Sequence, residues 1–203
     1  DNIPEVVAVV DGKEISGETF AENYEAQFQQ LAMQAQMSGE EPDQDKLKQQ
    51  ALEMLINSEL LVMEAEEQGF SASEEDVDEY LAKMAEDNGL ESSEKLMEEL
   101  KGQGLSEERI REDLQKEVLI DQVVETLDVK EPSDKELKEM YDTQVEQLEA
   151  MNEQVEEEQA QEAPSFEEME PQLKQQAVMQ KENEAISKFL DELRNDTEIE
   201  TKL

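Results

Sequence analysis

The sequence predicts a mainly α-helical fold in which a small β element pairs the two ends of the chain. Three observations lead to this prediction. Apolar residues recur every three or four positions along most of the 203 residues, which is the pattern of helices with one buried face. The apolar run Val6–Val10 is typical of a strand but is too short to form a sheet alone. A polar strand candidate, residues 198–202, stands at the opposite end and can supply the partner.

The N-terminal part of the chain predicts a strand, a turn and two long helices. Asp11 and Gly12 suit the turn, and Ser16 can cap a first helix that extends to about Met37. The apolar stripe of this helix comprises Phe20, Tyr24, Phe28, Leu31 and Ala35. The break at Ser38–Pro42 separates it from a second helix, which opens at one of the two aspartates that follow.

Capping and stop signals predict where the other helices begin and end. Gly69 and Gly89 suit the positive φ that follows the last turn of a helix. Ser133 and Ser165 are each followed three residues later by glutamate, the pattern of a capping box. The remaining predicted starts are Ser73, Ser93 and Ser106. Pro171 lies inside the last helix, so we expect it to kink that helix or to shift its start.

Residues 146–164 form an acidic segment without a basic residue. A narrow apolar stripe continues to Val155, which predicts that the preceding helix reaches about Val155 and that a connector follows. Residues 1–145 and 165–203 then form one domain that spans 1–203, with 146–164 as its acidic connector.

Composition excludes several classes of function. The net charge of −40 repels nucleic-acid phosphates and anionic lipid surfaces, so no nucleic-acid or membrane-surface partner is expected. The chain has no Cys and no His, which removes disulfides, thiolates and the commonest general base. No phosphate-binding loop, nucleophile elbow or EF-hand loop is present. We therefore expect no enzyme activity, cofactor or specific metal site.

Six segments occur in an order that resembles the chaperone core of the SurA-type periplasmic chaperones and the PrsA-type extracellular foldases. Each segment alone is ordinary helix or strand sequence, and the succession makes the resemblance specific. It covers nearly the whole chain except the acidic connector. The segments are residues 7–16, 50–61, 69–77, 110–120, 132–137 and 166–200.

The resemblance implies an ATP-independent chaperone or foldase core that binds unfolded secreted or cell-envelope proteins outside the cytoplasm. Members of this family commonly carry a parvulin-type prolyl isomerase domain between the region of Tyr141 and the last helix. The acidic connector stands in that position here, and the usual parvulin site uses histidines that this chain lacks. Isomerase activity is therefore not expected. Natural absence and removal of the isomerase domain both stay open.

Methionine suits a surface that holds many different unfolded chains, because its side chain is unbranched and polarizable. We expect a concave substrate-binding face that contains Met33, Met37, Met140 and Met151, with Tyr141 nearby. The alternative for each methionine is that it fills a gap in the core.

Other questions of partnership and anchoring stay open at this stage. A helical structural or adaptor protein with one specific protein partner is the alternative function, and a homodimer is compatible with the sequence. No apolar run is long enough to span a bilayer. The sequence begins at Asp1, so a processed leader or a lipid anchor upstream also stays open.

Overall fold

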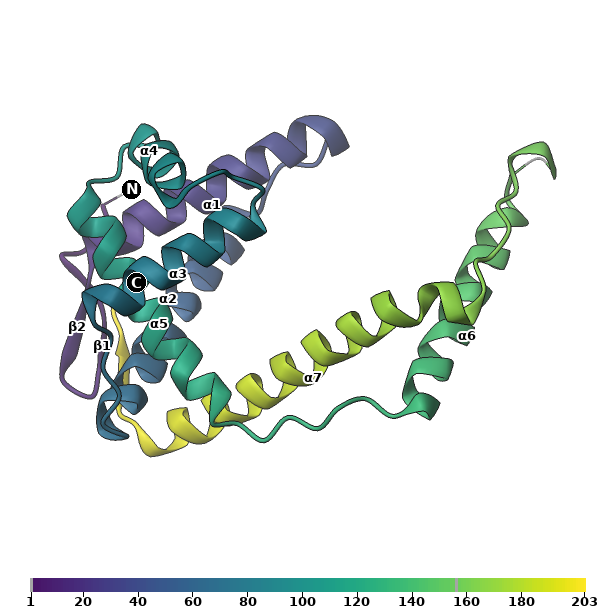
Figure 1. The fold of residues 1–203 in the computed structure, drawn as a ribbon. Helices are drawn as coiled ribbons and strands as arrows, with labels where there is room; N and C mark the ends of the chain where they lie inside the picture. Colours follow the sequence, from purple (N-terminus) through teal and green to yellow (C-terminus); the bar gives the residue numbers. More distant parts are fainter. Residues whose placement is uncertain (1, 156) are drawn as a thin grey trace. The chain divides into compact units, whose positions relative to one another are not determined.

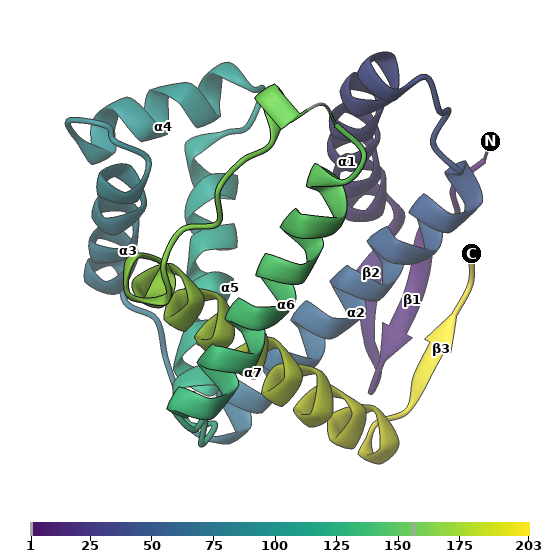
Figure 2. The same ribbon diagram turned by 90° about the vertical axis from the view of Figure 1, so that its right-hand side faces the viewer.

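The computed structural model describes residues 2–155 and 157–203, and Figure 1 shows the course of their helices and strands. Three strands form a small antiparallel sheet: β1 (Val6–Val10), β2 (Lys13–Ser16) and β3 (Ile199–Thr201). β1 is the middle strand, with β2 on one edge and β3 on the other, as Figure 2 shows. The predicted pairing of the N-terminal strand with the C-terminal strand is therefore confirmed.

The closing strand is tied to β1 by main-chain hydrogen bonds at both ends. The N–H of Asp11 donates to the carbonyl of Glu198 at 2.8 Å, and the N–H of Lys202 donates to the carbonyl of Val7 at 2.8 Å. Val7, Ala8 and Val10 are completely buried. A middle strand that is covered in this way must be apolar along most of its length, which explains the composition of Val6–Val10.

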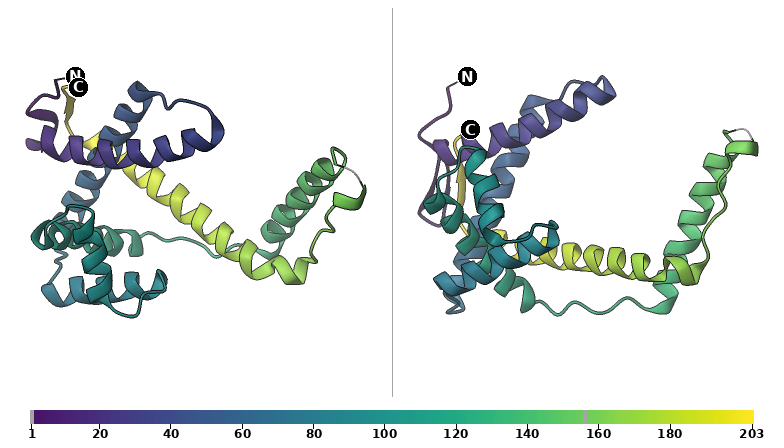
Figure 3. Two further views of the ribbon diagram at one scale, coloured as in Figure 1. Left: turned by 90° about the horizontal axis from the view of Figure 1, so that it is seen from above. Right: turned by 45° about the horizontal axis from the view of Figure 1, so that its top comes forward.

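The first compact unit contains the residues up to Thr126 together with 189–203. Between β2 and the unit's boundary it has five helices: α1 (Gly17–Ser38), α2 (Gln44–Glu67), α3 (Glu74–Asp87), α4 (Ser93–Gly102) and α5 (Glu107–Glu125). α1 and α2 form a helical hairpin and pack on each other, and Figure 3 shows their course in two views. α2 also packs on α5, while α3 packs on α4 and α5.

Local side-chain and glycine signals set the ends of these helices as predicted. The Ser16 hydroxyl accepts the Thr19 N–H at the start of α1, and Ser73 forms a full capping box with Asp76. Gly69, with φ of 82°, follows the end of α2. Because these signals act over three or four residues, they can be recognised without knowledge of the tertiary structure.

Gly17 is required by a close approach between α1 and the N-terminal segment. Its N–H donates to the carbonyl of Glu5 at 2.8 Å. A Cβ atom at this position would lie 2.0 Å from the carbonyl oxygen of Pro4, which is a backbone atom. Any side chain here would therefore push the start of α1 away from the segment that leads into β1.

The buried residues of the first unit form three clusters. One lies between β1, β2, α1 and α2 and has Phe20 and Ile56 among its fully buried side chains. A second joins α3, α4 and α5 around Val77. A third joins α2 to α5 around Val123. Leu190 and Leu193 pack against both the first and the third cluster, so the end of the last helix connects them.

The second compact unit contains residues 127–188. It comprises α6 (Asp134–Asn152), the short 3-10 helix η1 (Glu157–Gln159) and the first part of α7 (Phe166–Asp196). Leu137, Leu173 and Ala177 are its buried apolar residues, and they join α6 to α7. The last turns of α7 belong to the first unit.

One boundary of this unit differs from the sequence prediction. α6 ends at Asn152, whereas the apolar stripe predicted a helix to about Val155. Val155 is 43% exposed, so it has no core to hold a further turn in place. α7 begins at Phe166 in spite of Pro171, because Ser165 and Glu168 satisfy each other's backbone N–H groups at 3.0 and 3.3 Å. The start that the capping box at Ser165 predicts is therefore confirmed, and Pro171 does not shift it.

We predict that Glu200→Pro lowers the free energy of unfolding by about 2 kcal/mol, because proline removes a ladder hydrogen bond. Since the Lys202 N–H points to β1, the alternation of an antiparallel pair directs the Glu200 N–H to β1 and the Thr201 N–H to the free edge. Thr201→Pro is therefore the matched control, with a much smaller effect. Thermal unfolding followed by circular dichroism measures the stability of both variants. Equal losses of stability would contradict the register in which β3 pairs with β1.

Candidate functional site

Large apolar side chains that remain exposed are mostly methionine. Among the described residues eight large hydrophobic side chains are exposed, and five of these are methionines. They make up half of the ten methionines in the chain, and Met97 is the only methionine in the buried core of those residues. Gap filling in the core therefore does not account for the five exposed methionines. The exposed set is Met33, Met37, Met54, Met151 and Met179.

The first methionine surface lies on the α1–α2 hairpin. Met33 and Met37 are 72% and 91% exposed near the end of α1. Met54 on α2 is 57% exposed, and its sulfur accepts a hydrogen bond from the Gln27 amide at 3.2 Å. We call Met33, Met37 and Met54 the hairpin methionines. α1 buries only Gly17 and Phe20 completely, so its C-terminal half presents apolar side chains to solvent.

The second group of predicted residues lies on α6. Met140 is half-buried against the Leu137 cluster, and Met151 is 66% exposed near the end of the helix. The hydroxyl of Tyr141 donates to the carbonyl of Pro164 at 2.8 Å, and its ring meets Phe166 edge-on with the centroids 5.5 Å apart. Tyr141 is therefore engaged in holding the chain that leads into α7.

The structure thus distributes the five predicted residues over two units. Met33 and Met37 belong to the first, and Met140, Tyr141 and Met151 belong to the second. Met54 was missed by the sequence prediction, because it stands in an apolar run of α2 that reads as core.

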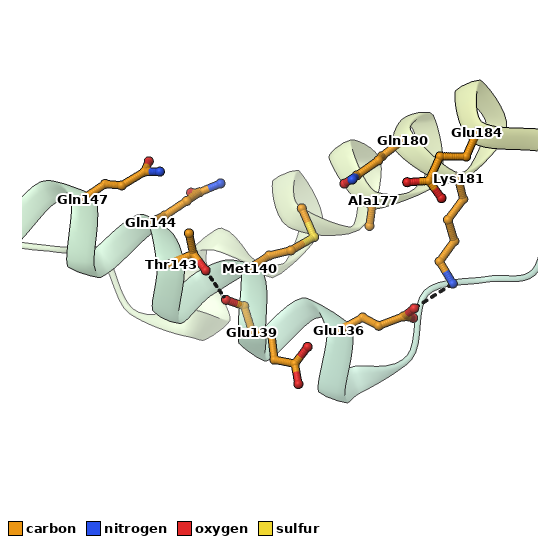
Figure 4. A pocket seen from close by; sticks show the side chains of 10 residues that line it. All are labelled: Glu136, Glu139, Met140, Thr143, Gln144, Gln147, Ala177, Gln180, Lys181 and Glu184. Carbon is orange, nitrogen blue, oxygen red and sulfur yellow. Dashed lines mark hydrogen bonds and ion pairs between the residues drawn. The ribbon is translucent and has the colours of Figure 1, made fainter. Parts of the chain in front are cut away.

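An open hollow of about 500 Å³ lies between α6 and α7 within the second unit, as Figure 4 shows. We call it the α6–α7 hollow. Met140 points from α6 toward α7, where Ala177 faces the same space. The other lining residues are polar: Glu136, Glu139, Thr143, Gln144, Gln147, Gln180, Lys181 and Glu184. The Gln144 amide donates to the amide oxygen of Gln176 at 3.0 Å and so links the two helices.

Glu136 combines two tasks at the edge of the α6–α7 hollow. Its carboxylate caps α6 by accepting the Ser133 N–H at 2.7 Å, and it forms an ion pair with Lys181 at 3.1 Å. The N–H of Ser133 and then the Lys181 ammonium lower the pKa of Glu136 below its ordinary value of 4.5. Glu136 is therefore ionised at neutral pH, and its charge is already matched by Lys181.

A second hollow of about 330 Å³ lies between β2, α1, α2 and α5, and its lining is ionic. The Lys13 ammonium lies 2.7 Å from the carboxylate of Glu59, whose side chain is only 14% exposed. The hydrogen bond to Glu59 raises the pKa of Lys13. Arg109 lies 3.1 Å from Glu22 on α1 and 3.3 Å from Asp113. These charges match each other, which suits a structural role in joining the elements.

Two features of the described part of the chain concern metal ions and membrane spans. Within residues 2–155 and 157–203, no group of three or more His, Cys, Asp or Glu side chains is placed to hold a metal ion. Among the helices described there, none combines the length and the apolar character that crossing a membrane requires.

A row of acids follows one side of α5. Asp113, Glu117, Asp121 and Glu125 recur every four residues and therefore face each other along the helix. Burial and then the charges of Asp121 and Asp113 raise the pKa of Glu117. Burial and the charge of Glu125 raise the pKa of Asp121. The folded state thus opposes ionisation of Glu117 and Asp121.

Comparison with known proteins finds one family. The family model described as the SurA-like N-terminal domain matches residues 1–124. Chaperone SurA of Legionella pneumophila (strain Lens) is 32% identical over 122 residues, which make up 60% of this chain and 27% of that protein. Chaperone SurA of Pseudoalteromonas translucida is 34% identical over 89 residues, or 44% of this chain and 20% of that protein. The chain thus spans only a minor part of these curated relatives.

Comparison with solved structures finds the same fold. The similar chain belongs to a structure described for two structurally related SurA-like chaperones of Campylobacter jejuni, the virulence factor PEB4 and the periplasmic protein Cj1289. The TM-score is 0.57 at 14% sequence identity, and the match covers 98% of this chain and 99% of the other. At this identity the likeness establishes a SurA-like fold and nothing further.

We predict that stability rises when the pH falls from 7 toward 5. A carboxyl whose pKa is raised by folding binds its proton more tightly in the folded state, so its ionisation costs stability as the pH rises through the folded pKa. Glu117→Gln removes two like-charge contacts and should stabilise the protein at pH 7 by about 0.5–1 kcal/mol, with a smaller gain at pH 5.

Glu99→Gln is the matched control for charge, because no acid stands three or four residues from Glu99 on either side. Urea titrations at the two pH values measure both variants. An equal gain in stability from Glu99→Gln would contradict the conclusion that Glu117 is repelled by its neighbouring acids. A gain in stability from Glu117→Gln that does not change with pH would contradict it as well.

Proposed function

Because the chain belongs to the family of proteins with a SurA-like N-terminal domain, we propose that it is an ATP-independent chaperone that binds unfolded secreted or cell-envelope proteins. The observation that supports this proposal most is the exposure of five methionines on the described helices. Exposed apolar side chains cost solubility, and where they gather in one patch, as we propose for the hairpin methionines, they indicate contact with other polypeptides. The net charge of −40 offsets that cost by keeping the protein and its complexes apart.

Methionine supports binding of many clients rather than of one. Its unbranched side chain has several rotamers of similar energy, and its sulfur makes favourable contacts with aliphatic and aromatic groups. The hairpin methionines can therefore adjust to different apolar segments. An adaptor with a single partner would be better served by rigid aromatic anchors, and aromatic residues are only 4% of this chain.

We propose further that the chain catalyses no prolyl isomerisation. The family matches contain the SurA-like N-terminal domain and no parvulin domain. The acidic segment 146–164 is too short for a parvulin domain, and the sequence contains no histidine. In this proposal residues 1–145 and 165–203 act together as the chaperone domain, and 146–164 serves as the connector between them.

The proposed place of action is outside the cytoplasm. Support comes from the family and from the periplasmic protein Cj1289 in the structural comparison. A chaperone that needs no nucleotide suits a compartment without ATP. Met140, Tyr141 and Met151 on α6 complete the proposed client-binding set that begins with Met33 and Met37.

The test is suppression of the aggregation of an unrelated unfolded protein at a near-stoichiometric ratio. We predict suppression by the unaltered chain and about fivefold weaker client binding by the double variant Met33→Gln with Met37→Gln, which removes about 1 kcal/mol of apolar contact. Light scattering measures aggregation, and fluorescence anisotropy of a labelled unfolded client measures affinity.

The matched control replaces two exposed glutamines of the same helix, Gln29→Ala with Gln36→Ala, and should bind clients as the unaltered chain does. Absence of any suppression, together with tight binding to one partner only, would favour the adaptor instead. A prolyl-peptide assay with the same preparation should give no rate above background.

A further inference from the structure

The α6–α7 hollow combines an apolar floor with a polar wall. Ala177 is 4% exposed and belongs to the buried cluster of this unit, and Met140 packs against that cluster. These two side chains form the floor. The volume of about 500 Å³ lies in the range of sites that bind small ligands or short peptide segments. An apolar side chain of another polypeptide can therefore rest on the floor.

The wall offers carboxamides that are free to bind a main chain. Within residues 2–155 and 157–203, the side chains of Gln147 and Gln180 have no hydrogen-bond partner. Each carboxamide can donate and accept a hydrogen bond, as can each peptide unit of an extended chain. Hydrogen bonds of this kind contribute affinity without reading the side chains of the bound segment.

The charge of the lining selects among such segments. Three carboxylates, Glu136, Glu139 and Glu184, face one ammonium group, that of Lys181. Lys181 is already paired with Glu136 at 3.1 Å. Glu139 has only a loose contact of 3.8 Å with a highly exposed lysine, and in the described part of the chain Glu184 has no ion pair. The lining therefore has excess negative charge that a cationic side chain would match.

We propose that the α6–α7 hollow binds an extended client segment in which an apolar residue is flanked by lysine or arginine. The apolar side chain lies on Met140 and Ala177, the main chain meets Gln147 and Gln180, and the cationic groups approach Glu139 and Glu184. This inference rests on the proposed function, because it names the class of client segment that one surface of the chaperone takes. A uniformly apolar helix would instead leave the carboxamides and carboxylates without partners.

The experiment uses the full chain and three labelled peptides of about 12 residues, which are long enough to cross the hollow when extended. The peptides share alternating apolar residues and differ only at the other positions, which are lysine, glutamine or glutamate. Fluorescence anisotropy measures their affinities at low and high salt. We expect the lysine peptide to bind about fivefold more tightly than the glutamine peptide at low salt, and the glutamate peptide to bind most weakly.

Two sets of variants locate the effect. Glu139→Gln with Glu184→Gln should remove most of the preference for the lysine peptide. The matched control Glu149→Gln with Glu182→Gln changes the same charge on the same two helices, at positions that do not line the hollow, and should keep the preference. Thr143→Trp places an indole in the hollow from an exposed position and should weaken binding of all three peptides.

Equal affinities for the three peptides, or equal losses in the two glutamate variants, would overturn the inference. Aggregation suppression by the same unaltered preparation separates the two proposals. If suppression occurs and the peptides bind without preference, the inference about the hollow fails and the chaperone proposal stands. If the unaltered chain suppresses no aggregation and binds no peptide, both proposals fail.

Discussion

The main-chain pairing of β3 with β1 is the constraint on which the first unit depends. β1 is paired on both edges only when the tail returns, and without β3 the main-chain N–H and C=O groups of its second edge would lack ladder partners. The return also brings Leu190 and Leu193 to two core clusters. Arg194 then reaches α2, where its guanidinium donates to the amide oxygen of Asn57 at 2.8 and 3.2 Å. The end of the chain therefore supports the sheet and the helices at once.

The surface of the protein reflects a balance between apolar exposure and charge repulsion. The hairpin methionines are available for contact because α1 buries little of its own surface beyond Phe20. The acidic surface keeps such molecules apart, and the row that includes Glu117 indicates that the fold tolerates repulsion to do so. Repulsion among the acidic side chains lowers the stability of the fold, and the same charge keeps a surface with exposed apolar side chains soluble.

Much of the fold could be predicted from local signals. Ser16, Ser133 and Gly69 act within one turn of a helix, and the strand pairing followed from an apolar run that needed a partner. The apolar stripe predicts that α6 ends near Val155, three residues beyond its observed end at Asn152. The stripe continues past the point where a core remains to hold the helix. The end of α6 depends on which of its residues pack against a core, and local sequence signals do not give that packing.

The candidate site was less accessible to sequence reasoning. The methionines could be singled out by residue type, yet their exposure depends on which helix faces are covered, and so Met54 was missed. The wall of the α6–α7 hollow required the pairing of two helices, since Gln144 and Gln176 meet across 32 positions of sequence. Glutamines in acidic helices otherwise look like ordinary solvated positions.

Amide hydrogen exchange of the C-terminal tail can show whether the pairing of β3 with β1 holds the first unit together. If the tail closes the sheet, the N–H of Lys202 exchanges slowly and opens together with the β1 amides, as part of one cooperative unit. Exchange of Lys202 at the rate of an unstructured peptide, while α2 and α5 remain protected, would show that the helices fold without the returning tail and would contradict the account.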